Sequence, residues 1–280
     1  MPLEQPRPQQ RTEEVRAVTF DLDDTLWSGP AVLARANEQF HAFLAAQLPE
    51  LAAAFPPPAF DALIGRLMRE LPHAAHDFSF LRRHALRHCA RDLRLAPDAS
   101  DELLEQAFQA FLQPRSRPEL FAGVEELLAT LAQAPLGLGL GAITNGNCLL
   151  AELPPAVRAR VAFLVSPEHA GVAKPARGIF DTALRHFPEH VGHPHVVHVG
   201  DHYECDVVGA KNAGLRTVWV NAAWDKPDAL NRRALSAADA ARFPAADAIV
   251  KDVTAVLAVV TLWNHDAITQ QQEHHQITQS

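Results

Sequence analysis

The stretch Val15-Arg16-Ala17-Val18-Thr19-Phe20-Asp21-Leu22-Asp23-Asp24-Thr25 joins an apolar, β-branched run to three carboxylates within four residues. Such a run predicts a buried strand, and the acidic residues follow at the point where it ends. Because alternate residues of an extended chain point the same way, we expect Asp21 and Asp23 to face one small volume. Two carboxylates so close together repel each other, which favours a bound cation or a shared proton. Packing does not need this arrangement, whereas chemistry with a carboxylate nucleophile and a carboxylic proton carrier does.

The residues that follow change from the period of a strand to the period of an α-helix. Four amphipathic patterns in a row predict a small four-helix bundle inserted after the first strand. Their ranges are 31–48, 61–71, 78–95 and 100–111.

From residue 118 onward, patterns typical of strands alternate with patterns typical of helices. This alternation predicts an α/β fold, a Rossmann-like parallel sheet with helices on both faces. Ligands of such sheets bind beyond the carboxyl ends of the strands. The expected strands are 138–143, 161–165, 195–199, 217–220 and 248–250, and the expected helices are 124–132, 179–187 and 205–213.

The composition and the ends of the chain give the expected organisation. The chain has 280 residues, 48% of them hydrophobic, which is enough for a full core and a second unit. We expect a core of 15–27 and 119–264, a helical cap of 28–118, and unstructured tails of 1–14 and 265–280.

The charge and the cysteines indicate the surroundings of the protein. A formal net charge of −8 argues against a general nucleic-acid binder and against recruitment to anionic lipid. Three widely spaced cysteines, Cys89, Cys148 and Cys205, indicate free thiols in a reducing compartment. The N-terminus has no secretory h-region, and the apolar run 253–263 is too short to span a bilayer. We therefore expect a cytoplasmic protein, as a monomer or a homodimer, that does not enter a membrane.

Polar residues also follow the other expected strands. Thr144-Asn145-Gly146 offers a hydroxyl and backbone N–H groups at a strand end, although Asn-Gly is also a common turn. Lys174 precedes Pro175, and proline suits the first position of a helix. The helix dipole disfavours a cation just before a helix N-terminus, so a nearby anion would explain a lysine at this position. Asp201 and Asp206 follow the strand at 195–199, where they could equally cap a helix. Together these residues predict an oxygen-rich site for a hard cation, for which Mg²⁺ fits best.

The ordered motifs Asp21-x-Asp23-x-Thr25, Thr144, Lys174-Pro175 and Gly200-Asp201-x4-Asp206 resemble those of the haloacid dehalogenase-like hydrolase superfamily. The similarity spans about residues 15–221. The predicted helical insert lies where phosphatases of this superfamily carry a cap. The stretch 141–147 is similar to the branch that acts on flavin mononucleotide and on the ribitylaminouracil phosphate of riboflavin synthesis.

The resemblance implies a role for each of these residues. Asp21 would attack phosphorus and form an aspartyl-phosphate, and Asp23 would protonate the leaving alkoxide and then activate water. Phosphate oxygens would be bound by Thr144, the backbone N–H of Asn145 and Lys174. Mg²⁺ would be held by Asp21, the backbone carbonyl of Asp23, Asp201 and, directly or through water, Asp206.

The expected function is therefore Mg²⁺-dependent hydrolysis of a small phosphorylated metabolite. One alternative is a 2-haloacid dehalogenase, which would need neither Asp23 as an acid nor the metal. The other is a non-catalytic binding protein on the same scaffold, which would usually lack the nucleophile or the acid. The cap arginines could recognise a substrate anion, although a solvated helix face is the expected role; they are Arg82, Arg83, Arg87, Arg91 and Arg94.

Overall fold

A six-stranded, all-parallel sheet forms the centre of the computed structural model, which describes residues 13–95 and 100–279. The strand order is β3-β2-β1-β4-β5-β6. This confirms the predicted α/β fold; the expected N-terminal tail lies outside the described residues except for residues 13 and 14. The strands are β1 (Ala17–Phe20), β2 (Gly139–Ile143), β3 (Val161–Val165), β4 (Val196–Gly200), β5 (Arg216–Val220) and β6 (Ala248–Val250).

Strand β1 lies in the middle of the sheet and is buried along its whole length. At its end, Phe20 is paired with Ala142 of β2 on one side and with Val199 of β4 on the other. Because all three strands run in the same direction, the residues that follow them emerge at one edge of the sheet. This register brings together segments that are far apart in the sequence.

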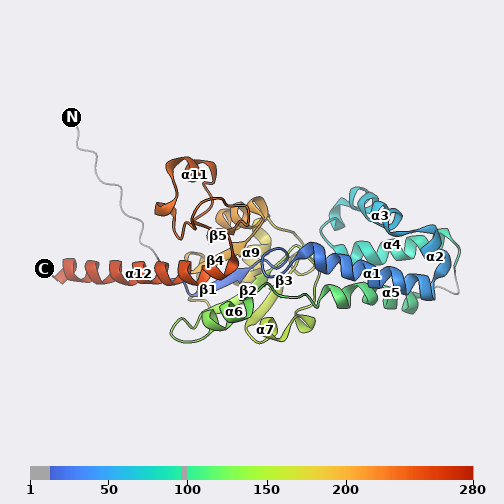
Figure 1. Cartoon of the computed structure of the whole chain (residues 1–280), viewed down its shortest axis with the longest axis horizontal. Coiled ribbons are helices and arrows are strands. Elements are labelled where there is room, and N and C mark those ends of the chain that lie inside the picture. The colour runs from blue at the N-terminus through green and yellow to red at the C-terminus, as the bar shows by residue number, and fades with distance from the viewer. Residues whose placement is uncertain (1–12, 96–99, 280) are drawn as a thin grey trace.

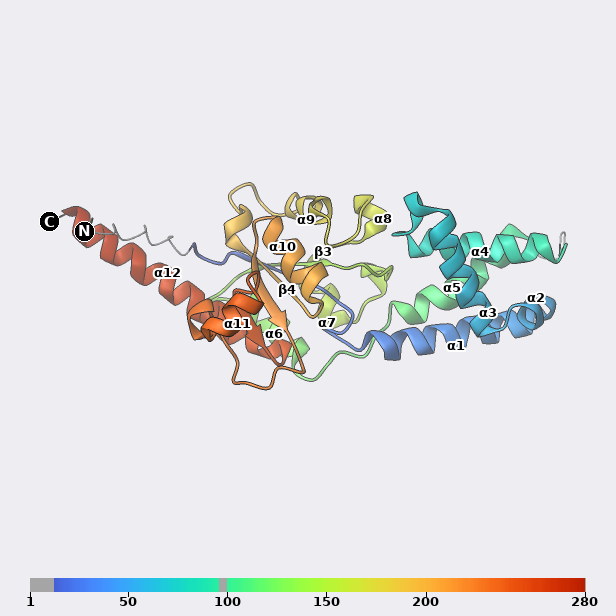
Figure 2. The same ribbon diagram turned by 90° about the horizontal axis from the view of Figure 1, so that it is seen from above.

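Helices cover both faces of the sheet (Figure 2). On one face, α6 (Val124–Ala132), α7 (Pro155–Arg158) and α12 (Val256–Gln279) share a core with the strands. On the other face, α9 (Arg177–Leu184) and α10 (Gly209–Asn212) do the same. Two short helices complete this unit: α8 (Pro167–Ala170) lies beside α9, and α11 (Ala237–Arg242) is near β6.

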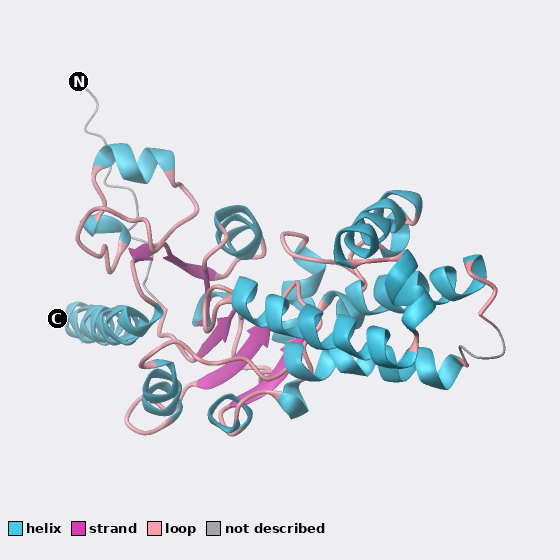
Figure 3. Ribbon diagram, turned by 45° about the vertical axis from the view of Figure 1, so that its right-hand side comes forward, coloured by secondary structure: helices cyan, strands magenta, loops and turns pink. Residues whose placement is uncertain are grey.

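The insert between β1 and β2 is a helical unit with its own apolar core. Its helices are α1 (Gly29–Gln47), α2 (Pro49–Ala54), α3 (Pro57–Glu70), α4 (Phe78–Asp92) and α5 (Asp101–Arg115). Four of them correspond to the predicted helices; α2 was not predicted, and Pro49 begins it as a first-turn proline. The unit extends from the edge toward which the strands point (Figures 1 and 3).

The sequence-based prediction is wrong at the C-terminal end of the described residues. Residues 265–280 were expected to be unstructured, but α12 continues to Gln279. Extending a formed helix needs no new nucleation, and residues 265–279 contain neither glycine nor proline. The helix expected at 205–213 is present, as a π-helical stretch over Tyr203–Val208 that continues into α10. In the part of the chain that the structure describes, no helix is both long and apolar enough to cross a membrane.

Candidate active site

Lys174 is buried at the carboxyl edge of the sheet, between two aspartates. Its Nζ donates to Asp21 Oδ1 at 2.5 Å, to Asp206 Oδ1 at 2.6 Å and to the backbone oxygen of Ile143 at 2.8 Å. An ammonium has three N–H donors, so this set uses all of them. The lysine therefore offsets charge on the nucleophile candidate from a fixed position.

The structure corrects the reason for the position of Lys174. Helix α9 begins at Arg177 with Ala176 as its N-cap, so Pro175 is not its first residue. The turn that carries the lysine is held instead by the side chain of Asn145. The Asn145 amide donates to the backbone oxygen of Lys174 at 3.0 Å and accepts from its backbone nitrogen at 2.8 Å. Asn145 therefore supports the lysine through its side chain, which sequence reasoning had not identified.

Three aspartates converge beside Lys174. One carboxylate oxygen each from Asp21, Asp201 and Asp206 lies within 4.8 Å of the other two. This donor set contains only oxygen and carries excess negative charge, so it fits a hard divalent cation such as Mg²⁺. The side chain of Asp23 is not in this group; the family resemblance implied a metal contact only through its backbone carbonyl, which stays a prediction. Asp21, Asp201 and Asp206 are the residues whose side chains would hold the metal.

Strand β4 allows the three carboxylates to converge because it ends in a glycine, Gly200. A Cβ atom at Gly200 would lie 2.3 Å from Cγ of Asp206, so any side chain there would displace the carboxylate. Asp206 is held on both oxygens: His198 Nε2 lies 3.3 Å from Oδ1, and the backbone nitrogen of His202 donates to Oδ2 at 2.9 Å. His198 is a buried residue of β4 that sequence reasoning missed, because its signal was only a histidine inside an apolar run.

The electrostatics of the site reflect burial and crowding of acids. Burial raises the pKa of Asp21 to about 8; Lys174 opposes that rise, and the charge of Asp206 adds to it. Burial alone would lower the pKa of Lys174, but the carboxylates of Asp206 and Asp21 outweigh burial and raise it. The pKa of Asp201 is also raised, by burial and then by the charges of Asp206 and Asp24. A bound divalent cation would favour the ionised carboxylates and so oppose these rises.

The turn after β2 lies against the same site. Thr144 is buried, and its Oγ1 accepts from the backbone nitrogen of Gly146 at 2.8 Å. A Cβ atom at Gly146 would lie 2.4 Å from Arg115 Nη2 and 3.0 Å from Asp23 Oδ2. Only glycine fits between these groups, so the turn brings backbone N–H and hydroxyl groups next to the acid candidate.

Asp23 is held by two donors that sequence reasoning had not paired with it. Trp27 Nε1 donates to Asp23 Oδ1 at 2.9 Å, and Arg115 Nη2 donates to Asp23 Oδ2. Arg115 is the last residue of α5 and is buried. The sequence did contain a signal: Arg115 lies seven, four and three residues after Phe108, Phe111 and Leu112, on the apolar face of that helix.

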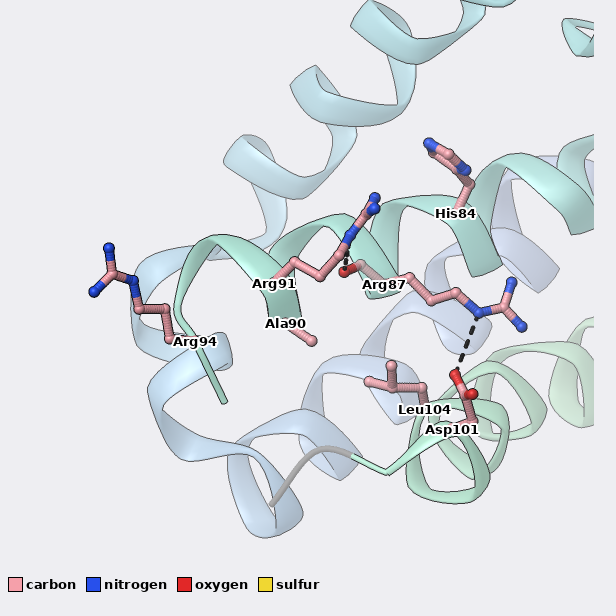
Figure 4. Close-up of a pocket in the computed structure, with 7 residues that line it drawn as sticks. All are labelled: His84, Arg87, Ala90, Arg91, Arg94, Asp101 and Leu104. Carbon is pink, nitrogen blue, oxygen red and sulfur yellow. Dashed lines mark hydrogen bonds and ion pairs between the residues drawn. The ribbon is translucent and has the colours of Figure 1, made fainter. Parts of the chain in front are cut away.

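The cap arginines have different environments. Arg82 is largely buried over the rings of Phe40 and Phe111, with its guanidinium carbon 5.1 and 3.6 Å from the ring centres, so the predicted solvated face is wrong for it. Burial lowers the pKa of Arg82 to about 10. Arg83 pairs with Glu105 at 2.8 Å. The other three, Arg87, Arg91 and Arg94, line a pocket made only of cap residues (Figure 4).

A parallel sheet with three convergent aspartates at its carboxyl edge, beneath an inserted helical cap, defines a capped α/β hydrolase. The family model for "haloacid dehalogenase-like hydrolase" matches residues 15–214. The chain belongs to this family.

Individual relatives differ in their activities. The chain is 27% identical over 206 residues to a 5-amino-6-(5-phospho-D-ribitylamino)uracil phosphatase of Escherichia coli (strain K12), covering 74% of this chain and 83% of that protein. It is 43% identical over 89 residues to a pyrimidine 5'-nucleotidase of the same strain; this match covers 30% of this chain and only 38% of the relative. The crystal structure of a 2-haloacid dehalogenase from Pseudomonas syringae pv. Tomato DC3000 matches with a TM-score of 0.73 and 32% identity, covering 89% of this chain and 99% of that one.

Proposed function

We propose that this hydrolase is a Mg²⁺-dependent phosphomonoesterase that works through an aspartyl-phosphate on Asp21. The observation that carries the proposal is the combination of Asp23 beside the site with the three-aspartate cluster. A hydrolase that releases halide has no use for a second carboxyl group as proton donor or for a divalent cation. A phosphatase needs both.

The first half of the reaction transfers the phosphoryl group to the protein. An oxygen of Asp21 bonds to phosphorus as the bond from phosphorus to the ester oxygen breaks. Asp23 gives its proton to the departing oxygen and becomes a carboxylate. Thr144 and the backbone N–H of Asn145 hold the phosphate oxygens. Lys174, whose three N–H donors are engaged by Asp21, Asp206 and Ile143, offsets negative charge from its fixed position, and Mg²⁺, when bound, supplies further positive charge that offsets the crowded anions.

The second half of the reaction restores the protein. A water oxygen bonds to phosphorus as the bond to Asp21 breaks, and Asp23 takes a proton from that water. Inorganic phosphate leaves, and Asp23 is again protonated. The cap would exclude bulk water and select the leaving group.

We propose a small phosphomonoester as the substrate. The activities of the relatives support a ribitylaminouracil phosphate or a pyrimidine nucleotide as first candidates, and the resemblance of residues 141–147 adds flavin mononucleotide. The free cysteines, two of them buried, support a location in the cytoplasm. We propose no nucleic acid or membrane as a partner.

A 2-haloacid dehalogenase remains the second candidate function because of the 32% identical dehalogenase structure. Both reactions begin with attack by a carboxylate such as Asp21, so the nucleophile does not distinguish them. Asp23, as proton donor, and the three-aspartate cluster do distinguish the two reactions, because only the phosphatase needs them.

The test is a substrate panel in Mg²⁺ and again in EDTA. It contains flavin mononucleotide, nucleoside monophosphates, sugar phosphates, p-nitrophenyl phosphate and 2-haloacids, with Asp21→Asn as the inactive control. We expect phosphate release that needs Mg²⁺ and is absent in Asp21→Asn. Halide release in EDTA would support the dehalogenase instead, and no turnover on any member would support a binding protein.

A further inference from the structure

Arg115 crosses from the cap to the α/β core. It ends α5, and only 2% of its side chain is exposed. Its Nη2 donates to Asp23 Oδ2, which joins a cap residue to a residue just after β1. In the proposed reaction, Asp23 is the proton carrier.

In the described part of the chain, burial leaves one nitrogen atom of the Arg115 guanidinium unpaired, as it also does for Arg82 of the cap. Arg115 Nη1 is buried and has no hydrogen-bond partner among residues 13–95 and 100–279. Leaving a charged donor buried and unpaired is costly, so the burial of this atom does not by itself stabilise the fold. Arg35 shows the contrast: it ties α1 to the end of the cap through the backbone oxygens of Pro114 and Arg117.

The two oxygens of Asp23 are held from different parts of the molecule. Oδ1 accepts from Trp27, which forms a bridge with Leu120 where the chain returns from the cap to the core. Oδ2 accepts from Arg115, which belongs to the cap. The N–H of Arg115 therefore lies against an oxygen that shares the negative charge once Asp23 has given up its proton.

We propose that Arg115 is a positioning residue: it orients Asp23 and stabilises the carboxylate formed when Asp23 protonates the leaving oxygen, so proton transfer is efficient only while the cap is seated. This inference rests on the proposed phosphatase function. The proton passes from Asp23 to the ester oxygen, and Arg115 keeps all of its own protons. Its contribution should therefore depend on how much the leaving group needs a proton.

The test compares two leaving groups in the Mg²⁺-loaded full chain. The kcat/KM value reports the steps up to phosphoryl transfer, for an alkyl phosphomonoester that the wild type hydrolyses and for p-nitrophenyl phosphate. Removing general acid catalysis costs about 10²–10⁴-fold when the leaving group needs a proton. We expect Arg115→Gln to lower kcat/KM at least about tenfold more for the alkyl ester, with Arg115→Lys in between.

The matched control is Arg117→Gln, which lies two residues after Arg115 in the segment that follows α5. Arg117 pairs with Glu152 at 2.7 Å on the surface, with 61% of its side chain exposed. This control should leave the ratio of the two kcat/KM values unchanged. Circular dichroism monitors folding, and Arg115→Lys, which keeps a cation, decides the question if Arg115→Gln does not fold.

A double-mutant cycle provides a second readout. If Arg115 acts through Asp23, adding Arg115→Gln to Asp23→Asn should lower kcat/KM for the alkyl phosphomonoester no further. Additive losses, or an equal fall for both leaving groups, would overturn this inference while leaving the phosphatase intact. A wild type that hydrolyses neither phosphate would overturn the proposed function and the role of Arg115 with it.

Discussion

Lys174 Nζ lies 2.6 Å from Asp206 Oδ1 and 2.5 Å from Asp21 Oδ1, so one buried ammonium contacts two acids from different strand ends. Replacing Lys174 by methionine leaves both acids buried without their cation. Breaking a buried pair in this way costs about 3–5 kcal/mol. We expect Lys174→Met to lower the free energy of unfolding by about that amount in urea, measured in EDTA.

The matched control for Lys174 is Lys211, which pairs with Asp247 at 2.7 Å with 39% of its side chain exposed. Exposed pairs contribute about 1 kcal/mol or less, so Lys211→Met should be nearly neutral. Equal losses in the two variants would contradict the role given to the buried ion pair.

Mg²⁺ should stabilise the folded protein through the aspartate cluster. A ligand that binds only the native state adds about 2.7 kcal/mol at a hundredfold excess over its Kd. We therefore expect Tm to rise with Mg²⁺ concentration in the wild type and to stay unchanged in Asp201→Asn. A sodium salt of equal ionic strength controls for screening, and an undiminished rise in Asp201→Asn would place the metal elsewhere.

Gly200→Ala should damage the metal site more than the fold. The added methyl would lie 2.3 Å from Asp206 Cγ, so the carboxylate would have to move. We expect the Mg²⁺-dependent rise in Tm and the activity to be lost together. Gly192→Ala is the matched control, because a Cβ atom there meets nothing closer than Pro194 Cδ at 3.8 Å; a similar loss in that variant would count against the argument.

The pKa of Asp21 predicts a pH dependence of stability in EDTA. Burial raises this pKa from 3.8 to about 8, so between these values the folded state keeps a proton that the unfolded state releases. The stabilising contribution of Asp21 to the free energy of unfolding is thus fully present below about pH 4 and is lost as the pH rises toward 8. The side chain introduced by Asp21→Asn cannot titrate. As the pH rises over this range, the free energy of unfolding of the variant should therefore increase relative to that of the wild type. A constant difference in urea unfolding from pH 4 to 8 would show that the proton is not held.

The three cysteines should differ in reactivity. Burial raises the pKa of Cys89 and of Cys148 to about 12, and both side chains are buried, whereas Cys205 is half-buried. Because thiolates are the reactive form, we expect an aromatic disulfide reagent to label Cys205 alone in the native protein and all three after unfolding. Fast labelling of more than one native thiol would mean that the cap or core opens readily.

Local pattern determined much of this protein from the sequence alone. The alternation of apolar runs and amphipathic segments predicted the parallel sheet and the four main cap helices, because burial imposes periods of 2 and 3.6 directly on the residues. The acids after β1 and β4 and the lysine between them were also identified, since polar residues at the ends of buried strands have few structural reasons to be there. Their roles remain predictions.

The tertiary structure decided which distant side chains meet. Arg115 reaches Asp23 across 92 residues, His198 supports Asp206 from inside a strand, and Asn145 rather than a helix start holds Lys174. A sequence pattern shows which face of an element is buried, but not which group lies against that face. Contacts between the cap and the core depend on how whole elements pack, and the free energy of that packing is spread over many residues rather than written in one motif.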